Sequence, residues 1–221
     1  MIKKNYLIFF LIIFCATFLR LYKLSSLPGE LHRDEVAIAY NAYSLLETGH
    51  DEHGQKWPFI FRSFGDYKLP GLIYSTLPFI KILGLNALAT RLPTAFFAIL
   101  TLPTLFYLIK KIGLDEKFAL LSMALLAFDF WHITQARNAY EPIAGLFFTI
   151  LAWALWIQGI KEKPKYFIGA ILIFGIGILF YNLPLLILPI LFLGSSLIYK
   201  KEIKFKKNCS FKFFSHLIYC Y

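Results

Sequence analysis

The chain has 221 residues, of which 58% are hydrophobic and only 16% are charged, and its mean hydropathy is +0.62. Soluble globular domains average about 45–50% apolar and about 25% charged residues. The composition therefore excludes disorder, a coiled coil and a disulfide miniprotein, and it indicates a chain that places most of its residues in lipid. The net charge is +10, but the lysines form short clusters between apolar runs. That pattern is typical of a membrane protein and predicts no nucleic-acid partner.

Six apolar runs are read as membrane-spanning helices. A hydrocarbon core of about 30 Å takes roughly 20 helical residues, and a backbone in lipid must satisfy its own hydrogen bonds, so helices are expected. The predicted fold is all-α, a polytopic bundle of about six spans. The predicted spans are Tyr6–Leu24, Asn86–Ile109, Lys117–Trp131, Pro142–Ile160, Tyr166–Tyr181 and Leu183–Tyr199.

The distribution of lysine and arginine predicts the orientation. Lysine clusters lie before the first span and around residues 110–117, 161–165 and 200–207, whereas residues 25–70 hold more acids than cations. The positive-inside rule then places the N-terminus in the cytoplasm and the large first loop, 25–70, outside the cell membrane. Within this loop, residues 34–48 have the apolar spacing of a short amphipathic helix.

The apolar run 69–85 is ambiguous because it contains Pro70, Pro78 and Lys81. It is either a seventh span or an interfacial or re-entrant helix on the outer surface, with Lys81 reaching the headgroups. We favour the surface helix, because a seventh span would move the lysines at 110–117 to the outside.

Two adjacent carboxylates, Asp34 and Glu35, open the amphipathic helix of the first loop. Acids at a helix N-terminus are stabilised by its free N–H groups and dipole, so capping alone explains them. The functional alternative is a general base at the membrane surface that takes the proton of an acceptor hydroxyl. Lys68, the last cation before the run 69–85, is either an interface anchor or a ligand for a phosphate at headgroup depth.

A second outer loop, between the third and fourth predicted spans, carries Arg137 and Glu141. Arg137 is either a further phosphate ligand or an ordinary loop charge. Glu141 precedes Pro142 at a helix start, where capping explains an acid without any function. Arg91 is interpreted as an interfacial anchor, and Asp129 lies near the outer end of the third span.

The histidines and cysteines give no diagnostic metal spacing. A site built from His32, Asp34 and His53 is conceivable, but nothing in their separation singles it out. The three cysteines form no metal-ligand pair and no disulfide framework. The sequence predicts neither a metal nor a cofactor.

Taken in order and with this topology, these features resemble the N-terminal part of the GT-C membrane glycosyltransferases. The branch concerned contains protein O-mannosyltransferases, the aminoarabinose transferase of lipid A and lipopolysaccharide-core transferases. The resemblance covers most of residues 1–200. The motifs that carry it are Arg33-Asp34-Glu35, Tyr67-Lys68-Leu69-Pro70, Ala89-Thr90-Arg91-Leu92-Pro93 and Arg137 followed by Glu141-Pro142.

The resemblance implies an inverting sugar transfer from a polyprenyl-phosphate donor to a lipid, glycan or protein acceptor outside the cytoplasm. It places the family's catalytic aspartate at Asp34, with Glu35 as a second catalytic candidate, and a lipid-phosphate ligand at Lys68, although Leu69 interrupts the family's Lys-Pro pair. Arg137 and Glu141 are the other substrate-binding candidates. The family's second outer acid is often aspartate, and here it is glutamate.

Family members are longer than this chain, so the resemblance implies that residues 1–207 form a partial glycosyltransferase domain. The tail 208–221 is too short and too polar to span a membrane. It is either an interfacial cytoplasmic segment or the mark of a truncated or frame-shifted copy.

Two other classes of function stay open at this point. A transporter would place polar residues or broken helices near the middle of the membrane, whereas the acids of this chain gather in an outer loop. A structural membrane subunit would have no particular use for Asp34.

Overall fold

The computed structural model describes residues 2–200, so the predictions for the tail at 208–221 and for the lysines beyond 200 lie outside the described residues. The elements in this part are α1 (Ile2–Leu21), α2 (Arg33–Thr48), β1 (Phe61–Ser63), β2 (Asp66–Lys68), α3 (Pro70–Leu83), α4 (Ala87–Ile112), α5 (Glu116–Ala127), α6 (Phe130–Ala136), α7 (Glu141–Lys161), α8 (Lys165–Ile178) and α9 (Leu183–Ile198).

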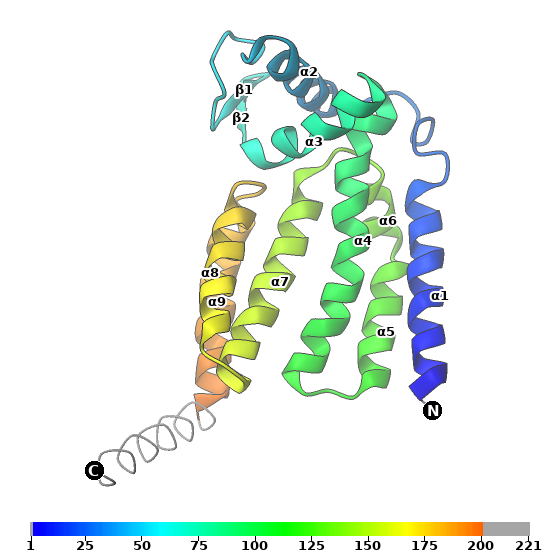
Figure 1. Cartoon of the computed structure of the whole chain (residues 1–221), viewed down its shortest axis with the longest axis vertical. Helices are drawn as coiled ribbons and strands as arrows, with labels where there is room; N and C mark the ends of the chain where they lie inside the picture. Colours follow the sequence, from blue (N-terminus) through cyan, green and yellow to red (C-terminus); the bar gives the residue numbers. More distant parts are fainter. Residues whose placement is uncertain (1, 201–221) are drawn as a thin grey trace, which may run out of the picture.

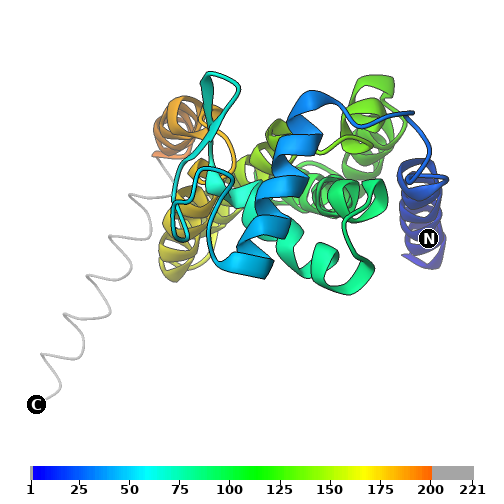
Figure 2. The same ribbon diagram turned by 90° about the horizontal axis from the view of Figure 1, so that it is seen from above.

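The molecule consists of a helical bundle and a cap across one end of it. Helices α1, α4, α5, α7, α8 and α9 run roughly parallel, while α2, α3 and the two strands lie across their upper end in Figure 1. We call residues 25–86 the cap. The start of α1 and the α4–α5 and α7–α8 turns lie at the opposite end. From above, α1 stands at one edge of the bundle and the hairpin overlies the α8–α9 edge (Figure 2).

Three helices of the described chain are long and apolar enough to cross a membrane, namely α1 from Lys4 onward, α4 and α7. The bent pair α5 and α6 passes the same test jointly, and α3, α8 and α9 are shorter apolar helices. The all-α, polytopic architecture is thus confirmed, whereas the number of spans stays a prediction. Helix α3 lies across the end of the bundle, the geometry expected of a surface helix (Figure 1).

The third predicted span, Lys117–Trp131, is not one helix. It ends at Ala127 and resumes at Phe130 with a bend of 59°. The side chain of Asp129 caps the new helix by accepting a hydrogen bond of 2.7 Å from the backbone N–H of His132. An acid at this position therefore starts a helix instead of standing inside one.

Arg20 of α1 closes the other side of this bend. Its guanidinium is fully buried and donates hydrogen bonds to the carbonyls of Leu126 and Ala127 at 3.4 and 3.1 Å. These are carbonyls that a helix end leaves without helical partners. Arg20 also forms a hydrogen bond of 2.8 Å with Nδ1 of His132. Arg20 is the donor in this bond, because a guanidinium has no acceptor atom.

The cap contains a short antiparallel hairpin that the all-α prediction did not include. Strands β1 and β2 pair with each other, so that Phe61 lies opposite Lys68 and Ser63 lies opposite Asp66. The two residues between them, Phe64 and Gly65, both have positive φ, 47° and 84°. Positive φ at both residues is what a type I′ two-residue hairpin turn requires, and glycine adopts this conformation without a steric cost.

The largest core cluster joins the cap to the bundle. Burying side chains of this size stabilises a fold by about 1.5–3 kcal/mol each, so the cap and bundle are held as one body. Its larger members are Ile38, Leu45, Phe61, Leu72, Ile73 and Ile80 from the cap and Phe147, Phe148 and Phe180 from the bundle.

Candidate active site

Three of the predicted site residues meet where the cap touches the bundle. Asp34 lies in the first turn of α2, Lys68 ends β2 and Glu141 begins α7. The Lys68 Nζ atom lies 3.6 Å from Oδ1 of Asp34 and 3.9 Å from Oε1 of Glu141. Asp34 and Lys68 are partly exposed, with 34% and 18% of their side chains accessible, whereas Glu141 is buried, with 12% of its side chain accessible. We call them the open cluster.

Local structure explains why Lys68 stands there. Its strand partner Phe61 is almost fully buried in the core, which anchors the hairpin. Lys68 is followed by Leu69 and by Pro70, which occupies the first turn of α3, a position that suits proline because it needs no N–H donor. The lysine is thus fixed between a core-anchored strand and a helix start.

A surface pocket of about 170 Å³ borders the open cluster. Lys68 and Glu141 line it together with residues of the α8–α9 connection, which the sequence did not single out. The full lining is Asp66, Tyr67, Lys68, Leu69, Glu141, Phe180, Tyr181 and Asn182. The pocket therefore combines one cation, two carboxylates, aromatic rings and an amide.

Two glycines hold the α8–α9 connection in this pocket. A Cβ on Gly71 would lie 2.6 Å from the Phe180 ring, and a Cβ on Gly145 would lie 2.7 Å from Cβ of Tyr181. The N–H of Gly71 also donates to the carbonyl of Leu179 at 2.8 Å. No charge pattern marks residues 179–182 in the sequence, so only the packing shows that they reach the site.

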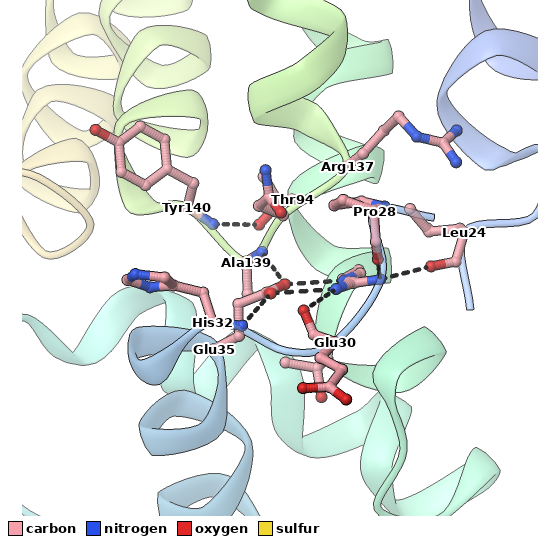
Figure 3. Close-up of polar contacts among 12 residues, drawn as sticks. Leu24, Pro28, Glu30, His32, Glu35, Thr94, Arg137, Ala139 and Tyr140 are labelled. Atoms are coloured by element: carbon pink, nitrogen blue, oxygen red, sulfur yellow. Dashed lines mark hydrogen bonds and ion pairs between the residues drawn. The ribbon is translucent and has the colours of Figure 1, made fainter. Parts of the chain in front are cut away.

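Glu35, the neighbour of Asp34, points the other way and is buried. Its Oε1 accepts hydrogen bonds from Nε of Arg91 at 2.9 Å and from the Ala139 N–H at 3.0 Å. Its Oε2 accepts from the His32 N–H at 2.9 Å and from a second Arg91 nitrogen at 3.2 Å. Figure 3 shows these contacts around Glu35. Each carboxylate oxygen therefore has two donors.

Arg91 is buried, which corrects its interpretation as an interfacial anchor. Its side chain has no exposed surface. Besides Glu35, the guanidinium donates to four backbone carbonyls of the segment that enters the cap, those of Leu24, Pro28, Gly29 and Glu30. A charge can be buried when it is paired and fully hydrogen-bonded, as here. We call Glu35 and Arg91 the closed pair.

The closed pair also sets the pKa of Glu35. Burial raises the pKa, but the hydrogen bonds from Arg91 and from the backbones of His32 and Ala139 lower it by more. The pKa therefore lies below its ordinary value of 4.5, and the carboxylate is ionised at neutral pH.

Arg137 lies apart from the open cluster. Its guanidinium donates to the carbonyls of Leu19, Tyr22 and Leu27 at 2.7–3.0 Å, and Figure 3 shows it turned away from Glu35. These contacts tie the α6–α7 connection to the end of α1. Its role as a phosphate ligand stays a prediction.

The open cluster has the features of an anion-binding and proton-accepting site. A partly exposed carboxylate, Asp34, is within reach of an incoming hydroxyl, and an ammonium lies beside it. An ammonium is also a point charge suited to a phosphate. Within residues 2–200, no group of three or more histidines, cysteines and acids is placed to hold a metal ion.

Comparison with known proteins identifies the class of protein to which the chain belongs. The family model described as dolichyl-phosphate-mannose-protein mannosyltransferase matches residues 7–218, nearly the whole chain. The match confirms the predicted resemblance to the GT-C glycosyltransferases and indicates a membrane glycosyltransferase. No curated protein matches the chain.

Proposed function

Because the chain belongs to the dolichyl-phosphate-mannose-protein mannosyltransferase family, we propose that it transfers a sugar from a polyprenyl-phosphate donor to a hydroxyl of an acceptor outside the cytoplasm. The acceptor is a lipid, a glycan or a protein, and the family name points to mannose and protein. The observation that carries the proposal is the position of Lys68 between Asp34 and Glu141 at the pocket.

Lys68 is the proposed ligand of the donor phosphate. A polyprenyl-phosphate sugar carries one negative charge on its phosphodiester, which the carboxylates of Asp34 and Glu141 would repel. The ammonium between them offsets this repulsion. When the bond between the sugar C1 and the phosphate oxygen breaks, the phosphate gains a second charge, which the same ammonium stabilises.

Asp34 is the proposed general base. Its carboxylate takes the proton of the acceptor hydroxyl as that oxygen attacks C1, and the polyprenyl phosphate leaves from the opposite side with inversion. Glu35 has two donors on each oxygen, so we assign it to positioning Asp34 and not to the proton transfer.

Glu141 and Arg137 have supporting roles in this proposal. Glu141 also contacts Lys68 and lines the pocket. Arg137 remains a candidate ligand of the donor phosphate, but its hydrogen bonds to three backbone carbonyls also stabilise the fold. Replacement of Arg137 is therefore expected to lower stability as well as any donor binding.

The test is Asp34→Asn, assayed in proteoliposomes with a polyprenyl-phosphate sugar and an acceptor. Asparagine keeps the shape of aspartate, and the N-cap of α2 is His32 and not Asp34, so folding is expected to be normal. Loss of the base lowers turnover by roughly a hundredfold or more, with donor binding retained. Glu47→Gln, an exposed acid in the last turn of the same helix, is the matched control. Near-normal turnover of Asp34→Asn would reject Asp34 as the base.

The orientation is a further part of the proposal, because the chemistry requires the cap outside. Arg62 in the hairpin and Leu114 in the α4–α5 turn are both exposed. With the native cysteines replaced by alanine, an impermeant maleimide added to intact cells is expected to label Arg62→Cys and not Leu114→Cys. The reverse pattern would overturn both the orientation and the proposed reaction.

A further inference from the structure

A groove lies between α1 and α5 at the end of the bundle opposite the cap. Lys4, Asn5 and Ile8 of α1 and Lys117 and Leu120 of α5 line it, and its volume is about 430 Å³. Because the proposed reaction takes place at the cap, this groove lies at the far end of the molecule from the active site (Figure 1).

The groove combines two cations with an apolar floor. Lys4 and Lys117 are exposed, and within residues 4–200 neither has a carboxylate partner. Lys111, in contrast, lies at the same end but is paired with Glu162. The acids beside Lys117, Asp115 and Glu116, do not line the groove. Ile8 and Leu120 belong to the packing between α1 and α5 and form the floor.

The surroundings of the groove are those of a bilayer edge. Lys4 is the first residue of the apolar stretch of α1. The large side chains Leu7, Phe10, Leu11 and Phe14 of that stretch are exposed and therefore face the acyl chains. A charged headgroup bound to the lysines can thus keep its chains in the lipid while one of them lies along Ile8 and Leu120.

We propose that this groove binds the headgroup of an anionic phospholipid, with the phosphate between Lys4 and Lys117. Basic pockets between helices at this side of a membrane bind anionic headgroups, and each lysine contributes to the attraction. The occupant is a lipid and not a soluble anion, because two exposed lysines alone are screened by salt. The apolar floor adds the contact that a free phosphate lacks. The site is independent of the sugar transfer.

The experiment is native mass spectrometry of the purified, delipidated full chain, titrated with phosphatidylglycerol or with phosphatidylcholine of identical acyl chains. We expect one phosphatidylglycerol to bind several-fold more tightly than phosphatidylcholine. Lys4→Gln with Lys117→Gln is expected to weaken phosphatidylglycerol binding on the order of tenfold. This variant keeps Lys3, so the N-terminal positive charge is reduced but not removed.

Two further variants separate the groove from general charge. Lys163→Gln with Lys165→Gln removes two exposed lysines from the α7–α8 turn at the same end and is expected to change binding less than twofold. Asn5→Trp fills the groove without altering any charge and is expected to lower phosphatidylglycerol binding. Equal losses in the two double lysine variants, or no preference over phosphatidylcholine, would overturn the proposal. Displacement of the lipid by millimolar inorganic phosphate would identify a free-anion site instead.

Discussion

The open cluster and the closed pair begin with two consecutive residues, and their environments are opposite. Lys68 of the open cluster contacts its carboxylates at 3.6 and 3.9 Å and borders a pocket. The Arg91–Glu35 contact of the closed pair is 2.9 Å, with 0% and 3% of the side chains exposed. Successive residues on a helix point about 100° apart, so one turn of α2 directs one acid to Lys68 and buries the next.

The two sites differ in whether their charged atoms already have all their hydrogen-bond partners. In the closed pair every carboxylate oxygen and every guanidinium nitrogen is engaged, so a ligand finds no vacant donor or acceptor. In the open cluster the contacts are longer, Asp34 and Lys68 are partly exposed, and Lys68 and Glu141 line a pocket. The closed pair holds the elements together, and the open cluster is available for chemistry.

The largest expected effect comes from breaking the closed pair. Arg91→Ala leaves the buried Glu35 charge without its partner, which typically costs about 3–5 kcal/mol. The free energy of unfolding in detergent is the measurement, and Arg62→Ala, at an exposed cap position, is the control. Replacing both partners by methionine should recover part of the loss, because no unpaired charge stays buried. A loss in Arg91→Ala no larger than that in Arg62→Ala would show that the pair is not a structural tie.

A smaller effect is expected from the cation of the open cluster. Lys68→Ala removes the proposed charge-assisted contact to the donor phosphate, and such a contact is worth about 1.5–3 kcal/mol. Lys81→Ala, an exposed lysine in the last turn of α3, is the matched control. Donor affinity in nanodiscs is the measurement. Equal affinities for the two variants would make Lys68 an interface anchor.

The smallest expected effect is the pH dependence of the closed pair. The pKa of Glu35 is lower in the folded chain than its ordinary value of 4.5, so the unfolded chain binds the proton more readily. The stabilisation is complete above that ordinary value and is lost as pH falls through the folded pKa. Unfolding free energies from pH 6 down to pH 3 should show this loss, and Glu35→Gln should remove this component. An unchanged pH profile in Glu35→Gln would contradict the assignment, and Glu47→Gln is the control.

Much of the open cluster is predictable from the sequence because its members follow local rules. Asp34 stands at a helix start, Lys68 before an apolar helix and Glu141 before Pro142. Each of these local patterns places its residue at one end of a helix. The orientation rule then places these ends on the same side of the membrane. Their actual contacts depend on packing, and the structure supplies those.

The closed pair was not predictable in the same way. Glu35 and Arg91 are separated by 56 positions, and an arginine at the start of an apolar run usually anchors a helix at the interface. Only the fold shows that the entry segment of the cap surrounds the guanidinium with carbonyls. The hairpin escaped prediction because its strands have three residues each, too few for a period-2 pattern. At the bend near Asp129, the carbonyls of Leu126 and Ala127 are bonded by Arg20 from another helix, a contact that no local pattern indicates.

The adjacency of Asp34 and Glu35 fixes what can move during a reaction cycle. Glu35 is bonded to α4 through Arg91 and to the residues before α7 through the Ala139 N–H. Asp34 is its peptide neighbour, so the contacts of Glu35 also restrain the backbone of Asp34. In the proposed reaction, Asp34 therefore stays at a fixed place relative to the bundle, and the acceptor and the lipid-linked sugar have to approach it.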